Sequence, residues 1–175
     1  AVAYGNHPSA RVPAAARACK EETLEKETLG YCRIYDWHTL RNQPPTKLKV
    51  SPLAAIPHKS RAYRQILDLA RGARTNNKQH PSVNDTTNKQ LAPQHSMKEL
   101  GSVLPRLIYA AATADEEAGP LLWAKWDIAD GYWRMAVAED DEWNFAYVPP
   151  KEHESEPTRI VRPMSLQMGW SESPP

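Results

Sequence analysis

An acid follows an apolar run in the second half of the chain. Residues 121–126 are apolar except for Lys125, which is typical of a strand buried on both faces, and Asp127 comes next. A carboxylate at the end of such a strand is a candidate ligand for Mg²⁺, which binds oxygen donors and combines one or two protein carboxylates with substrate phosphates. An acid in this position also commonly closes a turn or caps a helix. The pattern therefore predicts a metal ligand, with a cap or turn as the alternative.

Three segments resemble one known family, in the same order along the chain. The stretch from Lys125-Trp126-Asp127 to Gly131-Tyr132-Trp133-Arg134 resembles the first catalytic motif of reverse transcriptases from retrotransposons of the LTR, gypsy-like kind. Residues 61–69 resemble the fingers strand that carries the triphosphate-binding arginine, and residues 167–174 resemble the loop and helix start that hold the template and the incoming base. The resemblance covers about residues 50–175 and is weaker between 71 and 98.

The resemblance implies an α+β fold, with an antiparallel sheet and packed helices. It would be a partial polymerase palm and fingers, hence an incomplete right-hand fold. We expect a helical or irregular extension over residues 1–46, a fingers-like region over 47–120 and a partial palm over 121–175. The sequence begins with alanine and stops where the family opens a long palm helix, so we expect a fragment that lacks the rest of the palm and the thumb.

The family uses two magnesium ions, with manganese as an alternative, to hold the attacking hydroxyl and the leaving pyrophosphate in line. By resemblance Asp127 bridges both ions and the backbone carbonyl of Ile128 adds a ligand. The remaining acids belong to an aromatic-x-Asp-Asp hairpin that this sequence does not contain. Asp140-Asp141 lies in a Glu-Asp-Asp-Glu cluster that is typical of a solvated turn. We therefore expect an incomplete metal site and no primer extension by this chain alone.

The turn after Asp127 carries three nucleotide-binding candidates. By resemblance Tyr132 lies beneath the sugar, where its ring would clash with a 2′-hydroxyl and favour deoxynucleotides. Asp130 and Gly131 would form the turn beneath the triphosphate, where a small residue lets backbone amides approach phosphate oxygens. A core tyrosine and a helix cap are the alternatives for Tyr132 and Asp130.

Two further segments supply the other nucleotide-binding candidates. A planar guanidinium can both stack on a base and bind phosphate, so Arg64 is expected to contact the triphosphate, with Lys59 or Arg61 as a second positive charge. Solvated surface charge is the alternative for these residues. Gly169 would let the backbone approach the nucleotide and Met168 would supply a soft apolar contact, whereas Trp170 is expected to pack.

Composition limits the partners. With 22 basic and 21 acidic residues the net charge is +1, so nucleic-acid binding must depend on local clusters. No apolar run is long enough for a membrane span, and the two cysteines, Cys19 and Cys32, are expected to be ordinary thiols. We expect an intracellular protein, in the cytoplasm with the nucleus or element particles as alternatives. Its partners would be an RNA or DNA template with its primer, and deoxynucleoside triphosphates.

The elements that would position these residues follow from periodicity and turn signals. We expect a solvated helix over 13–29, a hairpin from strands at 47–56 and 63–69, and an exposed connection over 71–94. A helix should begin at Ser96 and be kinked or restarted at Pro105. Further strands are expected over 132–137, 142–148 and 158–164, with an exposed loop over 149–157.

The first hypothesis is a fragment of an RNA-directed DNA polymerase that adds deoxynucleotides to a primer. The second is a non-catalytic nucleic-acid-binding remnant of the same fold, because one catalytic strand is missing. The third is an α+β module for protein interactions whose motif matches are accidental.

Overall fold

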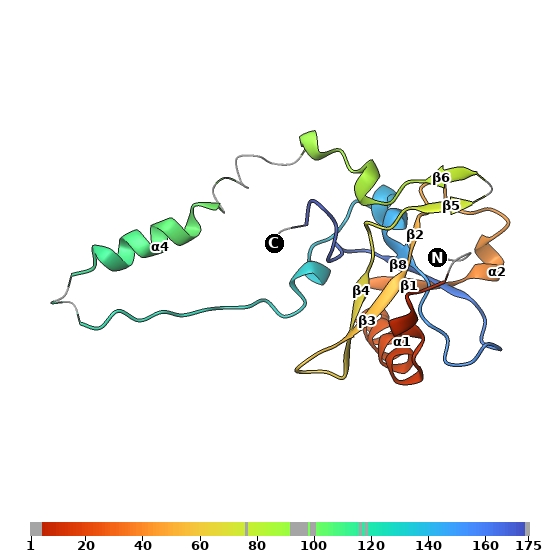
Figure 1. Cartoon of the computed structure of the whole chain (residues 1–175), viewed down its shortest axis with the longest axis horizontal. Coiled ribbons are helices and arrows are strands. Elements are labelled where there is room, and N and C mark those ends of the chain that lie inside the picture. The colour runs from red at the N-terminus through yellow and green to blue at the C-terminus, as the bar shows by residue number, and fades with distance from the viewer. Residues whose placement is uncertain are drawn as a thin grey trace. The chain divides into compact units, whose positions relative to one another are not determined.

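The computed structural model describes residues 5–75, 77–91, 98, 101–115, 117 and 119–173. Contacts between residues divide the chain into two compact units, residues 1–87 with 130–175 and residues 88–129 (Figure 1). Most of the expected start of the second helix, including Ser96 and Glu99, lies outside the described residues. The three expected regions 1–46, 47–120 and 121–175 stay a prediction, since they name parts of a polymerase.

The first unit begins with a short 3-10 helix, η1 (Pro8–Arg11), and the long helix α1 (Pro13–Thr28). Pro13 suits the first helical position because its missing N–H would have no partner there. Gly30 follows the helix with φ +76°, and the N–H of Tyr31 donates to the carbonyl of Lys26 at 2.9 Å. The predicted helix is confirmed, with its end one residue earlier.

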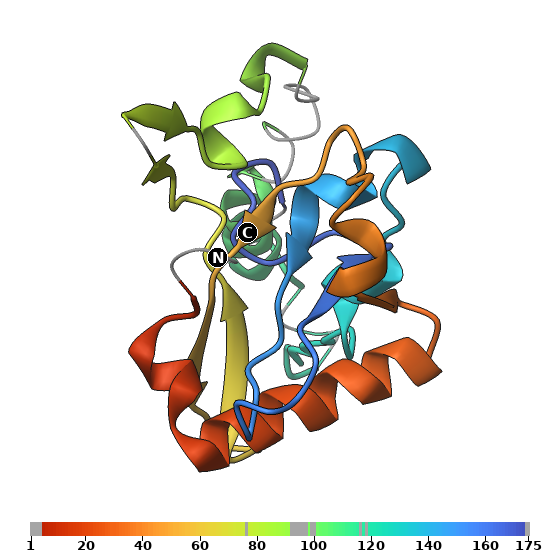
Figure 2. The same ribbon diagram turned by 90° about the vertical axis from the view of Figure 1, so that its right-hand side faces the viewer.

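The sequence predicts a solvated helix, but one face of α1 is buried. The buried face begins with Ala15 and Ala16, and its other members follow at intervals of three or four residues: Cys19, Thr23 and Lys26. They are small or polar, and the apolar stripe that marks most buried helix faces is therefore absent from the sequence. In Figure 2 the helix runs along the lower side of the strands that it covers.

The central sheet of the first unit has four strands in the order β1-β8-β7-β2. They are β1 (Cys32–Asp36), β8 (Arg159–Pro163), β7 (Ala146–Tyr147) and β2 (Val50–Ser51). The β1–β8 and β8–β7 pairs are antiparallel and the β7–β2 pair is parallel. The α+β class is confirmed, the strand expected at 158–164 is present, and the sheet is mixed rather than antiparallel throughout.

The expected hairpin is present as β3 (Leu53–Pro57) and β4 (Tyr63–Leu67). The strand expected at 47–56 is divided, however, because residues 50–51 belong to β2 in the central sheet and residues 47–49 form no strand. The two strands pair antiparallel, with Leu53 opposite Leu67 and Pro57 opposite Tyr63. Strands β5 (Ala73–Thr75) and β6 (Lys78–His80) form a second hairpin within the connection expected at 71–94. That connection also buries Ser82 and Val83, so it is not exposed throughout.

The first unit also contains the short helices α2 (Trp37–Leu40), η2 (Asn84–Thr86), η5 (Gly131–Arg134) and η6 (Glu139–Phe145). The strand expected at 142–148 is therefore mostly 3-10 helix, and only Ala146 and Tyr147 pair as strand. Asp140 and Asp141 are exposed on the first turn of η6, where Asp141 pairs with Lys47 at 2.8 Å. Asp140 and Asp141 fit the interpretation of solvated acids, whereas Glu142, the last acid of the cluster, is 5% exposed and pairs with Arg162 at 3.1 Å.

The main core lies between the sheet and the β3–β4 hairpin. Leu53, Tyr147 and Val161 are each 1% exposed or less, and each comes from a different strand. The rest of the cluster is Cys32, Leu67, Leu69, Val83 and Phe145, with Trp133 and Trp170 packed against it. The core thus contains residues of both β4, which carries Arg64, and β8, which is followed by the loop with Met168 and Gly169.

The second unit contains η3 (Lys89–Leu91) and helix α4 (Val103–Ala112). Pro105 lies in the first turn of α4, where a missing N–H costs little, as expected for a helix that restarts there. The prediction of a buried strand at 121–126 is wrong: residues 119–128 form no strand, and Trp126 is 90% exposed. An apolar run becomes a strand only when a neighbouring strand accepts its hydrogen bonds, and no described residue pairs with this run.

None of the described helices is long and apolar enough to span a bilayer.

Candidate functional site

Two predicted nucleotide-binding residues are brought into contact in the first unit. Arg64 lies on β4, opposite Ile56 in the hairpin. Its Nη2 donates to the Sδ of Met168 at 3.0 Å, although the two residues are 104 positions apart. Met168 is 37% exposed. The hairpin arginine and the loop after β8 therefore meet at the surface, where a ligand could reach both.

Gly169 holds this loop close to the end of β4. Its φ of +96° is one that other residues rarely adopt, and a Cβ there would lie 3.3 Å from the carbonyl oxygen of Leu67. The side chain of Asn84 closes the loop on its other side: its Nδ2 donates to the carbonyl of Gly169, and its Oδ1 accepts from the N–H of Ser171, each at 3.0 Å. The close backbone approach predicted at Gly169 is therefore to β4 in this structure.

Trp170 anchors the same loop in the core. Its Nε1 donates to Oγ1 of Thr87 at 2.8 Å, and its ring meets that of Phe145 edge to face with 5.7 Å between centroids. The prediction that Trp170 packs is confirmed.

Asp130 adopts a left-handed backbone conformation, with φ 55° and ψ 36°, at the start of the 3-10 helix η5 (Gly131–Arg134). Its carboxylate makes no capping hydrogen bond, so the cap alternative is wrong. Its Oδ2 instead lies 2.7 Å from Nζ of Lys26, whose side chain is 2% exposed against 32% for Asp130. The acid of the predicted triphosphate turn therefore neutralises a buried lysine of α1.

Gly131 and Tyr132 lie on η5 and are partly buried. The strand expected at 132–137 is thus wrong: a 3-10 turn comes first, followed by a single antiparallel bridge between Ala136 and Ser165. Trp133 stacks on Tyr31 with 6.4 Å between ring centroids. Trp133 packs against the core, whereas Tyr132 beside it is partly buried, and a core tyrosine stays the alternative for Tyr132.

The other two basic candidates are at the β3–β4 tip. Lys59 is exposed, in keeping with the alternative of a solvated charge. Nη1 of Arg61 lies 2.9 Å from Oε1 of Glu22 on α1. Burial raises the pKa of the Glu22 carboxyl, the cations of Arg61 and Lys26 oppose that rise, and the negative charge of Asp130 adds to it. Charges from α1, the hairpin tip and the η5 turn therefore influence one another.

Asp127 and Ile128 belong to the second unit and are described apart from these residues. Both are exposed, Ile128 to 70%, in a segment without regular structure. Among the described residues, no three or more His, Cys, Asp or Glu side chains gather into a group that could hold a metal ion. Asp127 and the carbonyl of Ile128 do not by themselves supply the ligands that two magnesium ions require.

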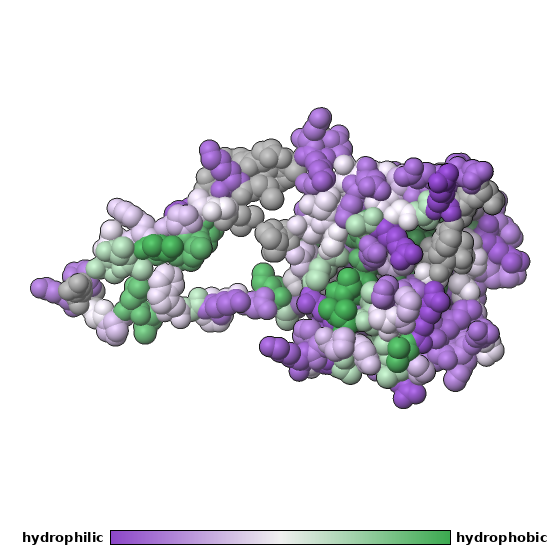
Figure 3. All heavy atoms as spheres, in the orientation of Figure 1, coloured by the Kyte–Doolittle hydropathy of each residue, from purple (hydrophilic) through white to green (hydrophobic). Residues whose placement is uncertain are grey.

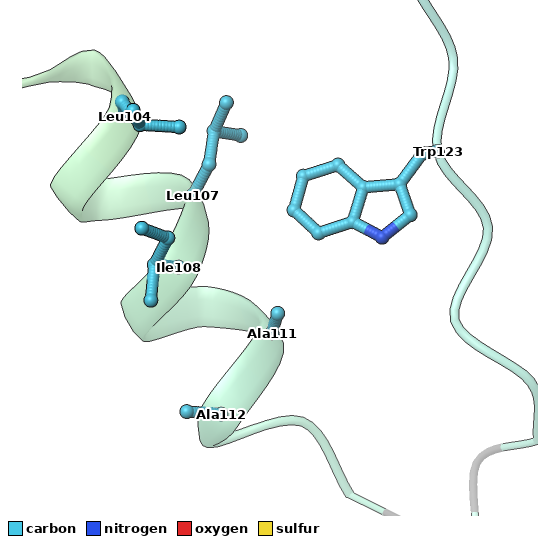
Figure 4. Close-up of a pocket in the computed structure, with 6 residues that line it drawn as sticks. All are labelled: Leu104, Leu107, Ile108, Ala111, Ala112 and Trp123. Carbon is cyan, nitrogen blue, oxygen red and sulfur yellow. The ribbon is translucent and has the colours of Figure 1, made fainter.

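The second unit presents an apolar surface of its own. An open, apolar hollow is lined by Leu104, Leu107 and Ile108 of α4 and by the ring of Trp123 (Figure 4). These residues are exposed, and the space-filling view shows a hydrophobic stretch along α4 (Figure 3).

Sequence reasoning missed three residues that hold the site together: Glu22, Lys26 and Asn84. Lys26 lies three residues after Thr23 and seven after Cys19, so helical periodicity places it on the buried face once that face is known. Asn84 lies in a polar stretch, and nothing in its surroundings marks it as the residue that ties down Gly169.

A scan against known protein families found no match for the chain, and a search of characterised proteins found none.

Proposed function

We propose that the chain forms the fingers and the first part of the palm of a retrotransposon reverse transcriptase, which adds deoxynucleotides to a primer on an RNA or DNA template. The observation that carries the proposal is the contact between Arg64 and Met168. It joins two of the three segments that resemble this family, and chance resemblances would have no reason to meet.

The chemistry of this contact suits an anionic ligand. A thioether sulfur is a weak hydrogen-bond acceptor, whereas phosphate oxygens accept charge-assisted and often bidentate bonds from arginine. An incoming triphosphate would therefore displace the sulfur of Met168 from the guanidinium at little cost. The freed thioether and the loop at Gly169 would then lie beside the base, and Tyr132 would exclude a 2′-hydroxyl.

Binding of nucleotide to the purified chain tests this proposal. A charge-assisted hydrogen bond contributes roughly 1.5–3 kcal/mol, so Arg64→Ala should weaken the binding of a deoxynucleoside triphosphate with Mg²⁺ by about tenfold or more. Arg41→Ala is the matched control, because Arg41 is an exposed arginine at the end of α2. Isothermal titration calorimetry measures both. Equal affinities in the two variants, or no binding by the wild type, would refute the proposal.

Primer extension tests the role of Asp127. The chain alone should extend no primer, and incorporation by it would contradict the expected need for further acids. In a polypeptide that joins this chain to an aromatic-x-Asp-Asp hairpin, Asp127→Asn should abolish extension, whereas Tyr132→Ala should mainly loosen sugar selection. Asp140→Asn is the control, since Asp140 is an exposed acid of η6. Near-normal extension by the Asp127 variant would end its assignment as a metal ligand.

A further inference from the structure

Lys26 is the most deeply buried charged side chain of α1. Its ammonium lies 2.7 Å from the carboxylate of Asp130, and the ring centroids of Tyr31 and Trp133 are 5.8 and 5.6 Å away. An ammonium taken out of water must be compensated, and here one carboxylate and the faces of two rings do so. A buried aliphatic residue would fill the same place without this requirement, so the charge itself calls for an explanation.

The backbone conformation of Asp130 explains why a charged residue is buried at position 26. A residue other than glycine with φ 55° is held in a sparsely populated conformation, which persists where its surroundings enforce it. Asp130 makes no side-chain capping bond to η5, and its carboxylate pairs with the ammonium of Lys26. The ion pair therefore anchors the first residue of the turn, and Gly131 and Tyr132 follow directly.

The same helix also contacts the hairpin that carries Arg64. Glu22 lies one turn before Lys26 on α1 and pairs with Arg61 of the hairpin tip. Two opposite charges four residues apart on one helix face thus contact both the η5 turn and the hairpin. This part of the chain, before residue 50, lies outside the resemblance to reverse transcriptases.

We propose that Lys26 is a positioning residue: through Asp130 it sets the place of Tyr132, and hence the discrimination between deoxyribose and ribose. The proposal rests on the proposed function, because it gives Lys26 a role in that site. If Lys26 were needed only for stability, its replacement would weaken the binding of the deoxyribonucleotide and the ribonucleotide by the same factor. A positioning lysine changes the ratio of the two affinities.

The test compares three variants of the full chain. Lys26→Met removes the charge at similar length, Lys26→Arg keeps it, and Lys20→Met is the matched control. Lys20 is on the same helix but pairs with Glu152 and Glu156, at 3.2 and 3.1 Å. Titrations with a deoxynucleoside triphosphate and the matching ribonucleoside triphosphate, each with Mg²⁺, give the affinity ratio.

We expect Lys26→Met to lower the preference for the deoxy form by about tenfold, since small displacements of positioning groups have effects of this order or larger. Lys26→Arg should restore most of the preference, and Lys20→Met should leave it unchanged. An unchanged ratio in Lys26→Met, or an equal loss in Lys20→Met, would overturn the proposal.

Amide hydrogen exchange separates a failure of this inference from a failure of the proposed function. Two amides report on the η5 turn: Arg134 N–H donates to the carbonyl of Asp130, and Met135 N–H to that of Tyr132. If the wild type binds no nucleotide, the proposed function fails. The anchoring role then survives only if Lys26→Met speeds exchange of these two amides by about tenfold while amides of β1 and β8 stay protected.

A double variant covers the case in which Lys26→Met does not fold. Lys26→Met with Asp130→Asn removes both charges, which is commonly tolerated where removal of one is not. We expect this variant to fold, to exchange faster at Arg134 and Met135, and to lose the deoxy preference. Retention of wild-type exchange and preference would overturn the proposal.

Discussion

The two units of the chain differ in how far they bury their apolar side chains. In the first unit, strands β3, β7 and β8 bury Leu53, Tyr147 and Val161 almost completely. In the second, α4 buries no described side chain, and Leu104 and Trp126 are 65% and 90% exposed. Apolar content therefore does not predict burial by itself, because burial needs a facing surface.

The difference extends to the candidate site. Arg64, Met168 and Asp130 have defined partners within the first unit. Asp127, on which the predicted metal chemistry depends, lies in an exposed segment of the second. These three residues proposed to recognise the nucleotide are thus held in place by contacts, whereas the residue proposed to hold metal lies in a segment without regular structure.

Matched leucine truncations give the largest expected contrast between the units. Leu53→Ala removes a fully buried side chain and should lower the free energy of unfolding by about 2–5 kcal/mol. Leu104→Ala removes an exposed one and should change it by about 0.5 kcal/mol or less. Urea denaturation followed by circular dichroism measures both. Similar losses in the two variants would show that the second unit packs as tightly as the first.

Thiol reactivity tests burial in the first unit directly. Burial raises the pKa of Cys19 to about 11 and that of Cys32 to about 12, so both thiols stay protonated at pH 8. Because the thiolate is the nucleophile, alkylation by iodoacetamide should be at least about 100-fold slower than at an exposed thiol. A cysteine introduced by Ala110→Cys, on an exposed position of α4, provides that reference. Comparable rates at all three positions would contradict the burial of the native thiols.

Two glycine substitutions compare the backbones of the units. Gly169→Ala places a Cβ 3.3 Å from the carbonyl oxygen of Leu67 at a φ of +96°, and should destabilise the chain by roughly 1–2 kcal/mol. Gly101→Ala meets nothing within 4 Å and should be neutral or slightly stabilising, because alanine favours helix. Thermal unfolding measures both. A neutral Gly169→Ala would show that the loop after β8 is not held against β4.

The smallest expected effect concerns the charge network around Glu22. Burial raises the pKa of its carboxyl, against the opposing cation of Arg61, so the folded chain binds this proton more tightly than the unfolded chain. The stabilisation is fully present below the unfolded pKa and is lost as pH rises through the folded pKa. Glu22→Gln should therefore match the wild type at low pH and become relatively more stable toward pH 7.

Unfolding free energies of both proteins across pH 3–7 measure this, with Glu25→Gln as the control at an exposed position of the same helix. Parallel curves for the wild type and Glu22→Gln would show that Glu22 is not buried in the folded chain.

Local patterns predicted the elements whose residues favour one structure without outside help. The helix starting at Pro13, the β3–β4 hairpin and strand β8 could all be read from helix signals, turn residues and alternation. The motifs also identified Arg64, Met168 and Gly169, three residues of the candidate site. Local patterns failed at 121–126 and 132–137, where apolar residues suggested strands whose partners a pattern cannot supply.

The sequence by itself determined where the chain turns and which residue types stand at the turns, because backbone preferences act over a few neighbours. Only the tertiary structure decided that Arg64 meets Met168, that Asp130 is bound by Lys26, and that residues 121–126 stay unpaired. Each of these depends on residues more than about 12 positions apart, whose pairing is set by the packing of the whole unit. A lysine on a helix face of small side chains carries no local signal of burial, and its partner becomes known only when the fold places a carboxylate beside it.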